Sequence, residues 1–195
     1  MIRNKMDITF LKKIWHFIWE EDSLLSWVVN VILAFILVKF VIYPGLGFLL
    51  ATTHPLVAVV SNSMEHDGLG FDNWWSQKGN WYLEKGIDKN EFNGFAFNKG
   101  FDMGDIMVLR GSKPENINIG DVIVFWGRSS NPIIHRVVSV EYIDNYIFQT
   151  KGDRNSEVSS YLGEDKITKD MVIGRAVLRI PYLGWIKIWF TELLK

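Results

Sequence analysis

The sequence contains no cysteine, and its charges nearly cancel, with 21 Lys and Arg against 22 Asp and Glu for a formal net charge of −1. The absence of cysteine excludes disulfides, thiolate zinc sites and cysteine nucleophiles. It does not identify the cellular compartment of the protein, because a core of this size needs no disulfide even in an oxidising compartment. Since no basic excess is present, the composition gives no indication of nucleic-acid binding, and we expect no nucleic-acid partner.

Apolar residues are in excess, and they are concentrated near the start of the chain. The segment 24–43 is apolar or aromatic except at Ser26, Asn30 and Lys39. Twenty helical residues span ~30 Å, the thickness of the hydrocarbon core of a bilayer. A buried core helix is the alternative, but such a helix usually keeps a polar stripe. The pattern predicts a transmembrane helix over 24–43, ended by Pro44-Gly45.

The flanks of this segment predict its orientation. Residues 1–23 carry Arg3, Lys5, Lys12 and Lys13, whereas residues 44–63 carry no Lys or Arg. The positive-inside rule then places the N-terminus in the cytoplasm and the rest of the chain outside. A cleaved signal peptide fits poorly, because no A-x-A site follows the apolar segment. We expect a single-pass protein of the cell membrane with an extracytoplasmic domain over 44–184.

That domain is expected to be mainly β. Strands are predicted at 57–60, 106–109, 122–126, 133–143, 146–150 and 171–178, with a hairpin turn at Asp144-Asn145. No alternation with long helices is present, which argues against a parallel α/β sheet.

Three further segments are rich in aromatic residues. Residues 67–101 hold nine of them, which suits a packed insertion, a membrane-dipping loop or part of a substrate groove, and packing is the default. Residues 8–19, within the N-terminal segment 1–23, are amphipathic and predict a short helix on the inner membrane surface. The tail 185–195 is too short for a second span, so we expect it to lie at the membrane interface or to pack on the domain.

Three short stretches, 59–66, 131–138 and 150–155, supply Ser63, His135 and Asp153. A serine hydroxyl is a weak nucleophile unless a base takes its proton, imidazole suits that role at neutral pH, and a carboxylate can orient the imidazole. A two-residue hairpin loop sets His135 opposite Arg154, and a three-residue loop sets it opposite Asp153. Only the second register, or a bulge, places His135 and Asp153 on one face.

These stretches resemble the type I signal peptidases of the archaeal and endoplasmic-reticulum kind. The matching motifs are Ser61-Asn62-Ser63-Met64-Glu65, the Gly-Asp pairs at 104–105 and 120–121, His135-Arg136, Lys151-Gly152-Asp153-x-Asn155, and 173–176 followed by 181–184. Bacterial relatives carry a catalytic Lys at the position of His135. Five motifs in order, behind a membrane span of predicted orientation, make the resemblance specific.

The resemblance implies a signal-peptidase-like β catalytic domain anchored by one N-terminal transmembrane helix. It implies a serine endopeptidase that removes signal peptides from exported preproteins, without metal or cofactor. Ser63 would be the nucleophile, His135 the general base and Asp153 its acidic partner. Ser61 would help to form the oxyanion hole, and Met64 would lie in the substrate-binding region. Expected partners are preproteins, the lipid bilayer and accessory membrane subunits.

The sequence departs from the family pattern at several positions. Asn62 stands where Gly is usual, His66 where Pro is usual, and Ser159 where many relatives carry a second Asp. His66 could therefore serve as an alternative base, and Glu157 or Asp165 as an alternative acid. The insertion at 67–101 is also long for the family. A non-catalytic membrane module of the same fold that binds apolar segments is the alternative function.

Overall fold

The computed structural model describes residues 8–193 and divides the chain into two compact units, Met1–Leu46 and Gly47–Lys195. Arg3 and Lys5, which contributed to the orientation prediction, lie outside the described residues, as do the last two residues of the tail.

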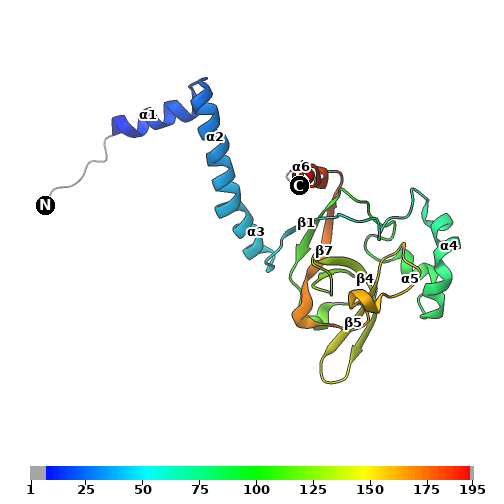
Figure 1. The fold of residues 1–195 in the computed structure, drawn as a ribbon. Coiled ribbons are helices and arrows are strands. Elements are labelled where there is room, and N and C mark those ends of the chain that lie inside the picture. Colours follow the sequence, from blue (N-terminus) through cyan, green and yellow to red (C-terminus); the bar gives the residue numbers. More distant parts are fainter. Residues whose placement is uncertain (1–7, 194–195) are drawn as a thin grey trace. The chain divides into compact units, whose positions relative to one another are not determined.

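The N-terminal unit is helical (Figure 1). Helix α1 (Ile8–Trp19) confirms the predicted amphipathic helix, and α2 (Leu24–Leu37) begins the predicted span. A π-helical turn (Val38–Ile42) and α3 (Tyr43–Leu49) continue α2 without a break, giving a helix over Leu24–Leu49. By length and composition this helix is able to cross a membrane, and its side chains are almost all exposed.

The expected helix end at Pro44-Gly45 is wrong, because the helix runs on to Leu49. Pro44 lies in the first turn of α3, directly after the π-helical turn. Within a helix, proline removes one backbone hydrogen bond and its ring clashes with the preceding turn. The π turn changes the backbone hydrogen-bond spacing directly before the proline, and the helix continues past it.

The C-terminal unit is built on one seven-stranded antiparallel sheet with the order β1-β2-β7-β3-β4-β5-β6, and it confirms the mainly β prediction (Figure 1). The strands are β1 (Leu56–Ala58), β2 (Ile106–Arg110), β3 (Val122–Phe125), β4 (Ile133–Tyr142), β5 (Tyr146–Lys151), β6 (Ile167–Thr168) and β7 (Val172–Ile180). Six of them match predicted strands. The two-residue β6 was not predicted, since it is too short to show a periodic pattern.

The two Gly-Asp pairs begin β2 and β3 with the same turn. Gly104 and Gly120 have φ of +90° and +91°, a region that favours glycine. The carboxylates that follow accept backbone N–H bonds from three residues upstream: Asp105 from Asp102 at 2.8 Å and Asp121 from Asn118 at 2.9 Å. The motif therefore sets the direction in which each strand enters the sheet.

The aromatic insertion is a packed helical element. It contains α4 (Phe71–Glu84) and α5 (Lys89–Asn93), which the sequence analysis did not predict as helices. Its buried aromatic side chains form one cluster with Val138 of β4: Trp74, Trp75, Tyr82 and Phe92. Of the roles considered for 67–101, packing is the one that the structure displays.

The C-terminal segment forms α6 (Gly184–Leu193). The half-buried Trp185 packs over Gly104, where a Cβ atom would lie 2.0 Å from the indole nitrogen. Trp189 is exposed. The start of the tail thus packs on the domain, and membrane contact by the remainder stays a prediction.

Lys151, the last residue of β5, joins the sheet to the insertion. Its buried ammonium lies 5.0 Å and 4.7 Å from the ring centroids of Trp81 and Tyr82 and donates to the carbonyls of Gly152 and Asn155 at 2.9 Å each. Burial lowers the pKa of Lys151 to about 8, although the charges of Asp153 and Glu164 partly oppose this effect. The ammonium is therefore a charge that the fold tolerates at a cost.

This shift predicts how stability depends on pH. Between about pH 8 and ~10.4 the folded state has lost the Lys151 proton while the unfolded chain still binds it, so stability rises with pH by at most about 3 kcal/mol. Lys151→Met removes the titrating group and should flatten this rise. Thermal midpoints of the full chain in detergent at pH 7.5 and 9.5 measure it, and equal rises in parent and variant would contradict the prediction.

Candidate active site

Ser63 and His135 are in direct contact, although 72 residues separate them in sequence. The Ser63 hydroxyl oxygen lies 2.8 Å from His135 Nε2. Ser63 is half-buried in the loop after β1, and His135 lies on β4 with 3% of its surface exposed. Backbone bonds fix the loop, because the carbonyls of Ser63 and Met64 accept from Arg154 N–H and Phe101 N–H at 2.9 and 3.1 Å.

The carboxylate bound to the other nitrogen of His135 belongs to Glu164, not to Asp153. Glu164 Oε1 forms a short hydrogen bond with His135 Nδ1 and also accepts from the Thr150 hydroxyl at 3.2 Å. Its second oxygen accepts from the backbone N–H of Ser159 at 2.9 Å. With Nδ1–H donating to the carboxylate, Nε2 is left to accept the proton of Ser63. Nucleophilic acyl transfer needs this order of groups.

The pairing of β4 with β5 explains why Asp153 does not reach His135. Tyr142 pairs with Tyr146, as the three-residue loop requires, and the pairing continues to Ser139 and Gln149. A bulge between Val137 and Ser139 then shifts the register by one residue, so that Arg136 pairs with Lys151. A one-residue shift moves a side chain to the other face of the sheet. The expected contact between Asp153 and His135 is therefore wrong.

Asp153 instead accepts hydrogen bonds from three segments of the domain. Arg136 donates to both carboxylate oxygens, Nε at 2.9 Å and Nη2 at 2.7 Å, and the Tyr82 hydroxyl donates at 3.0 Å. His66 Nε2 lies 3.1 Å from the second oxygen. Burial would raise the pKa of Asp153, but the charge of Arg136 and the bonds from His66 and Arg136 outweigh it and hold the pKa well below its ordinary value.

The guanidinium of Arg136 has a partner for each of its N–H groups. Besides Asp153, it donates to the backbone carbonyls of Ala96, Phe97 and Gly120 at 2.8 to 3.0 Å. It also lies over the ring of Phe92, 4.7 Å from the centroid. Arg136 thus attaches the end of the insertion to the strand that carries His135.

His66, considered as an alternative base, lies away from the nucleophile. It is 2% exposed, bonds to Asp153 and stacks on Trp74 with ring centroids 3.8 Å apart and planes 1° apart. The imidazole near Ser63 is that of His135.

The two remaining predicted site residues differ in exposure. The exposed hydroxyl of Ser61 lies 3.1 Å from the Ser63 hydroxyl, and its role in an oxyanion hole stays a prediction. Met64, expected in the substrate-binding region, is fully buried in the core, and its sulfur accepts the N–H of Asp153 at 3.4 Å. Its side chain therefore anchors the loop to the hydrophobic core and is not available to a substrate.

Two residues of this site were missed by sequence reasoning. Glu164 is the neighbour of Asp165, one of the alternative acids, but no motif distinguishes it. Gly152 lies so close to the Ser63–His135 pair that a Cβ atom there would be 2.7 Å from the Ser63 carbonyl oxygen and 2.9 Å from His135 Nε2. Gly152 is part of the Lys-Gly-Asp motif, but the sequence gives no sign of its close approach to Ser63 and His135, which leaves no room for a side chain.

Known proteins that this chain resembles include catalytic subunits of signal peptidase complexes. No protein-family model matches the chain. The signal peptidase complex catalytic subunit SEC11C of Homo sapiens is 34% identical over 98 residues, which cover 47% of this chain and 51% of the relative. The signal peptidase complex catalytic subunit SEC11 of Scheffersomyces stipitis is 26% identical over 159 residues, 78% of this chain and 75% of the relative, and that of Yarrowia lipolytica is 26% identical over 161 residues.

The chain thus spans about half the length of the SEC11C relatives and about three quarters of the yeast SEC11 proteins. These relatives, the antiparallel β domain and the apolar N-terminal helix agree with the motifs read from the sequence. The chain is therefore similar to the SEC11 catalytic subunits of signal peptidase complexes, in agreement with the resemblance to type I signal peptidases seen in the sequence.

Proposed function

We propose that this chain is a membrane-bound serine endopeptidase that removes N-terminal signal peptides from exported preproteins. The observation that carries the proposal is the continuous hydrogen-bonded series from the Ser63 hydroxyl through His135 to the buried Glu164. A non-catalytic module would have no need to bury a carboxylate against a histidine that faces a serine, because burying such a group is costly unless it is paired.

Each group has a distinct role in the proposed reaction. His135 Nε2 takes the Ser63 proton as the hydroxyl oxygen attacks the scissile carbonyl, and Glu164 stabilises the imidazolium that results. The imidazolium then protonates the leaving amine, and water hydrolyses the acyl-enzyme with His135 again as base. The Ser61 hydroxyl, 3.1 Å from the Ser63 hydroxyl, and the Ser63 backbone N–H are the proposed donors to the oxyanion.

Location and partners follow from the anchor and the relatives. The Leu24–Leu49 helix would hold the chain in the cell membrane, with residues 1–23 in the cytoplasm and the catalytic domain outside, where exported preproteins emerge. The relatives are named as subunits of a signal peptidase complex, so accessory membrane subunits are plausible partners of this chain too.

Ser63→Ala and His135→Ala test the function. Each should lower the rate of preprotein cleavage in liposomes by roughly three orders of magnitude or more, because the nucleophile and its base act as a unit. Circular dichroism should show both variants folded. Undiminished cleavage by either variant would exclude the proposal, and preprotein binding without turnover by the parent chain would favour the non-catalytic module.

Glu164→Gln and Asp153→Asn separate the two carboxylates. Glu164→Gln should lower kcat by about 10⁴-fold with little change in thermal midpoint, because an amide no longer stabilises the required tautomer and cation of His135. Asp153→Asn should mainly destabilise the domain, by about 3–5 kcal/mol, because it leaves the buried Arg136 without its counter-charge.

The comparison of these two variants decides the assignment. Loss of turnover in a stable Asp153→Asn domain, together with an active Glu164→Gln variant, would return the acid role to Asp153.

Gly152→Ala tests the packing against the catalytic pair. A Cβ atom at this position cannot coexist with the Ser63 carbonyl and His135 Nε2 where they lie, so one of them must move. A displacement of about 1 Å is enough to lower kcat by roughly 10²-fold. Gly70→Ala is the matched control, because nothing lies within 4 Å of its Cβ position. Equal kcat values for the two variants would show that the close approach does not constrain catalysis.

A further inference from the structure

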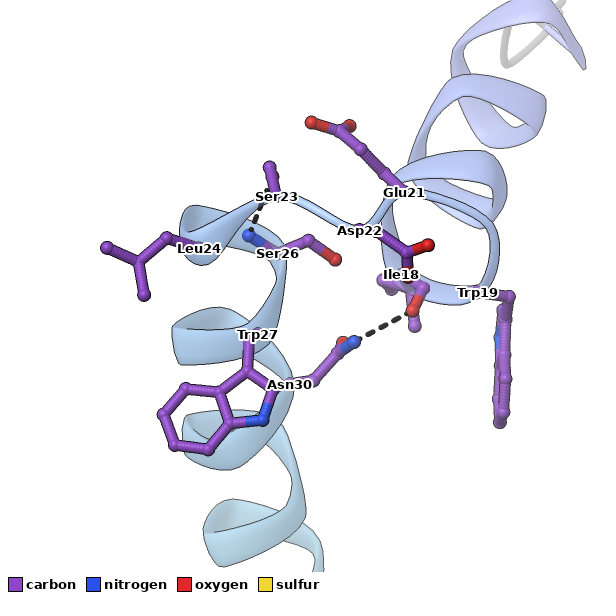
Figure 2. A pocket seen from close by; sticks show the side chains of 9 residues that line it. All are labelled: Ile18, Trp19, Glu21, Asp22, Ser23, Leu24, Ser26, Trp27 and Asn30. Atoms are coloured by element: carbon purple, nitrogen blue, oxygen red, sulfur yellow. Dashed lines mark hydrogen bonds between the residues drawn. The ribbon is translucent and has the colours of Figure 1, made fainter.

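Two of the three polar residues in the apolar segment 24–43 face α1. Among the residues of α2, all of which the structure describes, Ser26 is the only buried one. Its hydroxyl donates to the carbonyl of Phe17 at 2.5 Å. One helical turn further on, the amide of Asn30 donates to the carbonyl of Ile18 at 2.8 Å, a contact drawn in Figure 2.

These bonds give partners to backbone carbonyls at the C-terminal end of α1. The last carbonyls of a helix have no partner within it, and leaving them unpaired is costly where water is scarce. The carbonyl of His16 accepts the N–H groups of Glu20 and Glu21, and side chains of α2 supply donors for the next two carbonyls.

The start of α2 is fixed on the other side of the turn. The Ser23 hydroxyl caps α2 by accepting the N–H of Ser26 at 3.1 Å. The turn between the helices is thus bonded at both ends, and the chain changes direction there (Figure 2). We call the segment from Phe17 to Asn30 the elbow.

The faces of α1 match a lipid surface. At 100° per residue, the apolar side chains Leu11, Ile14, Trp15 and Ile18 share one face, and Lys12, Lys13 and His16 lie away from it. The apolar side chains are largely exposed in this unit, with Trp15 at 62%.

The inner side of the elbow is a pocket of about 390 Å³ lined by Trp19 and Trp27, residues typical of the membrane–water interface.

We infer that the elbow holds α1 flat in the headgroup layer, with its apolar face against the lipid, at the end of the membrane span. The occupant of that face is the bilayer, because α1 is bonded to the first two turns of the spanning helix and therefore lies at the level where that helix enters the membrane. The basic side chains of α1 then meet the phosphate groups. Ser26 and Asn30 are positioning residues in this arrangement, and it is independent of proteolysis.

The lack of native cysteine allows a direct test in the full chain. Leu11→Cys and Lys13→Cys each introduce a single thiol, on opposite faces of α1. Each single-cysteine chain is reconstituted in vesicles of phosphatidylcholine with phosphatidylglycerol and treated with a charged, membrane-impermeant maleimide. The Lys13→Cys chain defines the fraction that is accessible. The thiol of Leu11→Cys should react about tenfold more slowly, because the apolar face is immersed ~5–10 Å.

Breaking the elbow should remove this protection while the span stays inserted. Ser26→Ala combined with Asn30→Leu makes the span more apolar yet deletes both donors to α1, and should bring the two labelling rates within about twofold. Lys39→Leu also makes the span more apolar but leaves the elbow intact, and Ser26→Thr keeps the hydroxyl, so both should preserve the tenfold difference.

Three outcomes would overturn the inference. They are equal labelling of the Leu11→Cys and Lys13→Cys chains that keep Ser26 and Asn30, protection that persists when Ser26→Ala/Asn30→Leu is added, and protection in native membranes but not in pure lipid vesicles. The last would assign the apolar face of α1 to a protein partner. Since no step depends on peptide cleavage, the result stands whether or not the chain proves to be a peptidase.

Discussion

The C-terminal β domain depends on one buried carboxylate. Asp153 is fully buried, and its charge is held by Arg136, Tyr82 and His66. These donors come from the strand that carries His135, from the aromatic insertion and from the loop that carries Ser63. An isolated charge at this position would be prohibitively costly, so each segment is constrained to deliver its donor. The same constraint that stabilises the charge therefore brings the segments that carry Ser63 and His135 together.

The parts of the fold that were predictable are those encoded by local patterns. Strand periodicity, the Gly-Asp turns and the apolar span each depend on neighbouring residues, and the proximity of Ser63 and His135 was implied by the family resemblance. The partner of His135 was not predictable in this way. A single bulge at Val138 moves Asp153 out of reach, and the packing of Val138 against the insertion has no signature in the strand itself.

Polar residues in the apolar span show a related limit of sequence reading. Counted by hydropathy, Ser26, Asn30 and Lys39 are three equivalent exceptions. In the structure the first two bond to backbone carbonyls of α1, whereas the ammonium of Lys39 lies 5.5 to 5.7 Å from the ring centroids of Phe40 and Phe35. Composition measures what it costs to place a polar group in lipid, but only geometry shows whether the cost is offset by a partner.

Two departures from the family pattern take part in contacts around the candidate site. His66 stands where Pro is usual, and its ring stacks on Trp74 of the long insertion, so the histidine and the insertion pack on each other. Ser159 stands where many relatives carry an Asp, and its backbone N–H binds the Glu164 carboxylate that contacts His135. Considered one position at a time, such changes suggest a weakened site, but Ser63, His135 and a buried carboxylate are in contact in the structure.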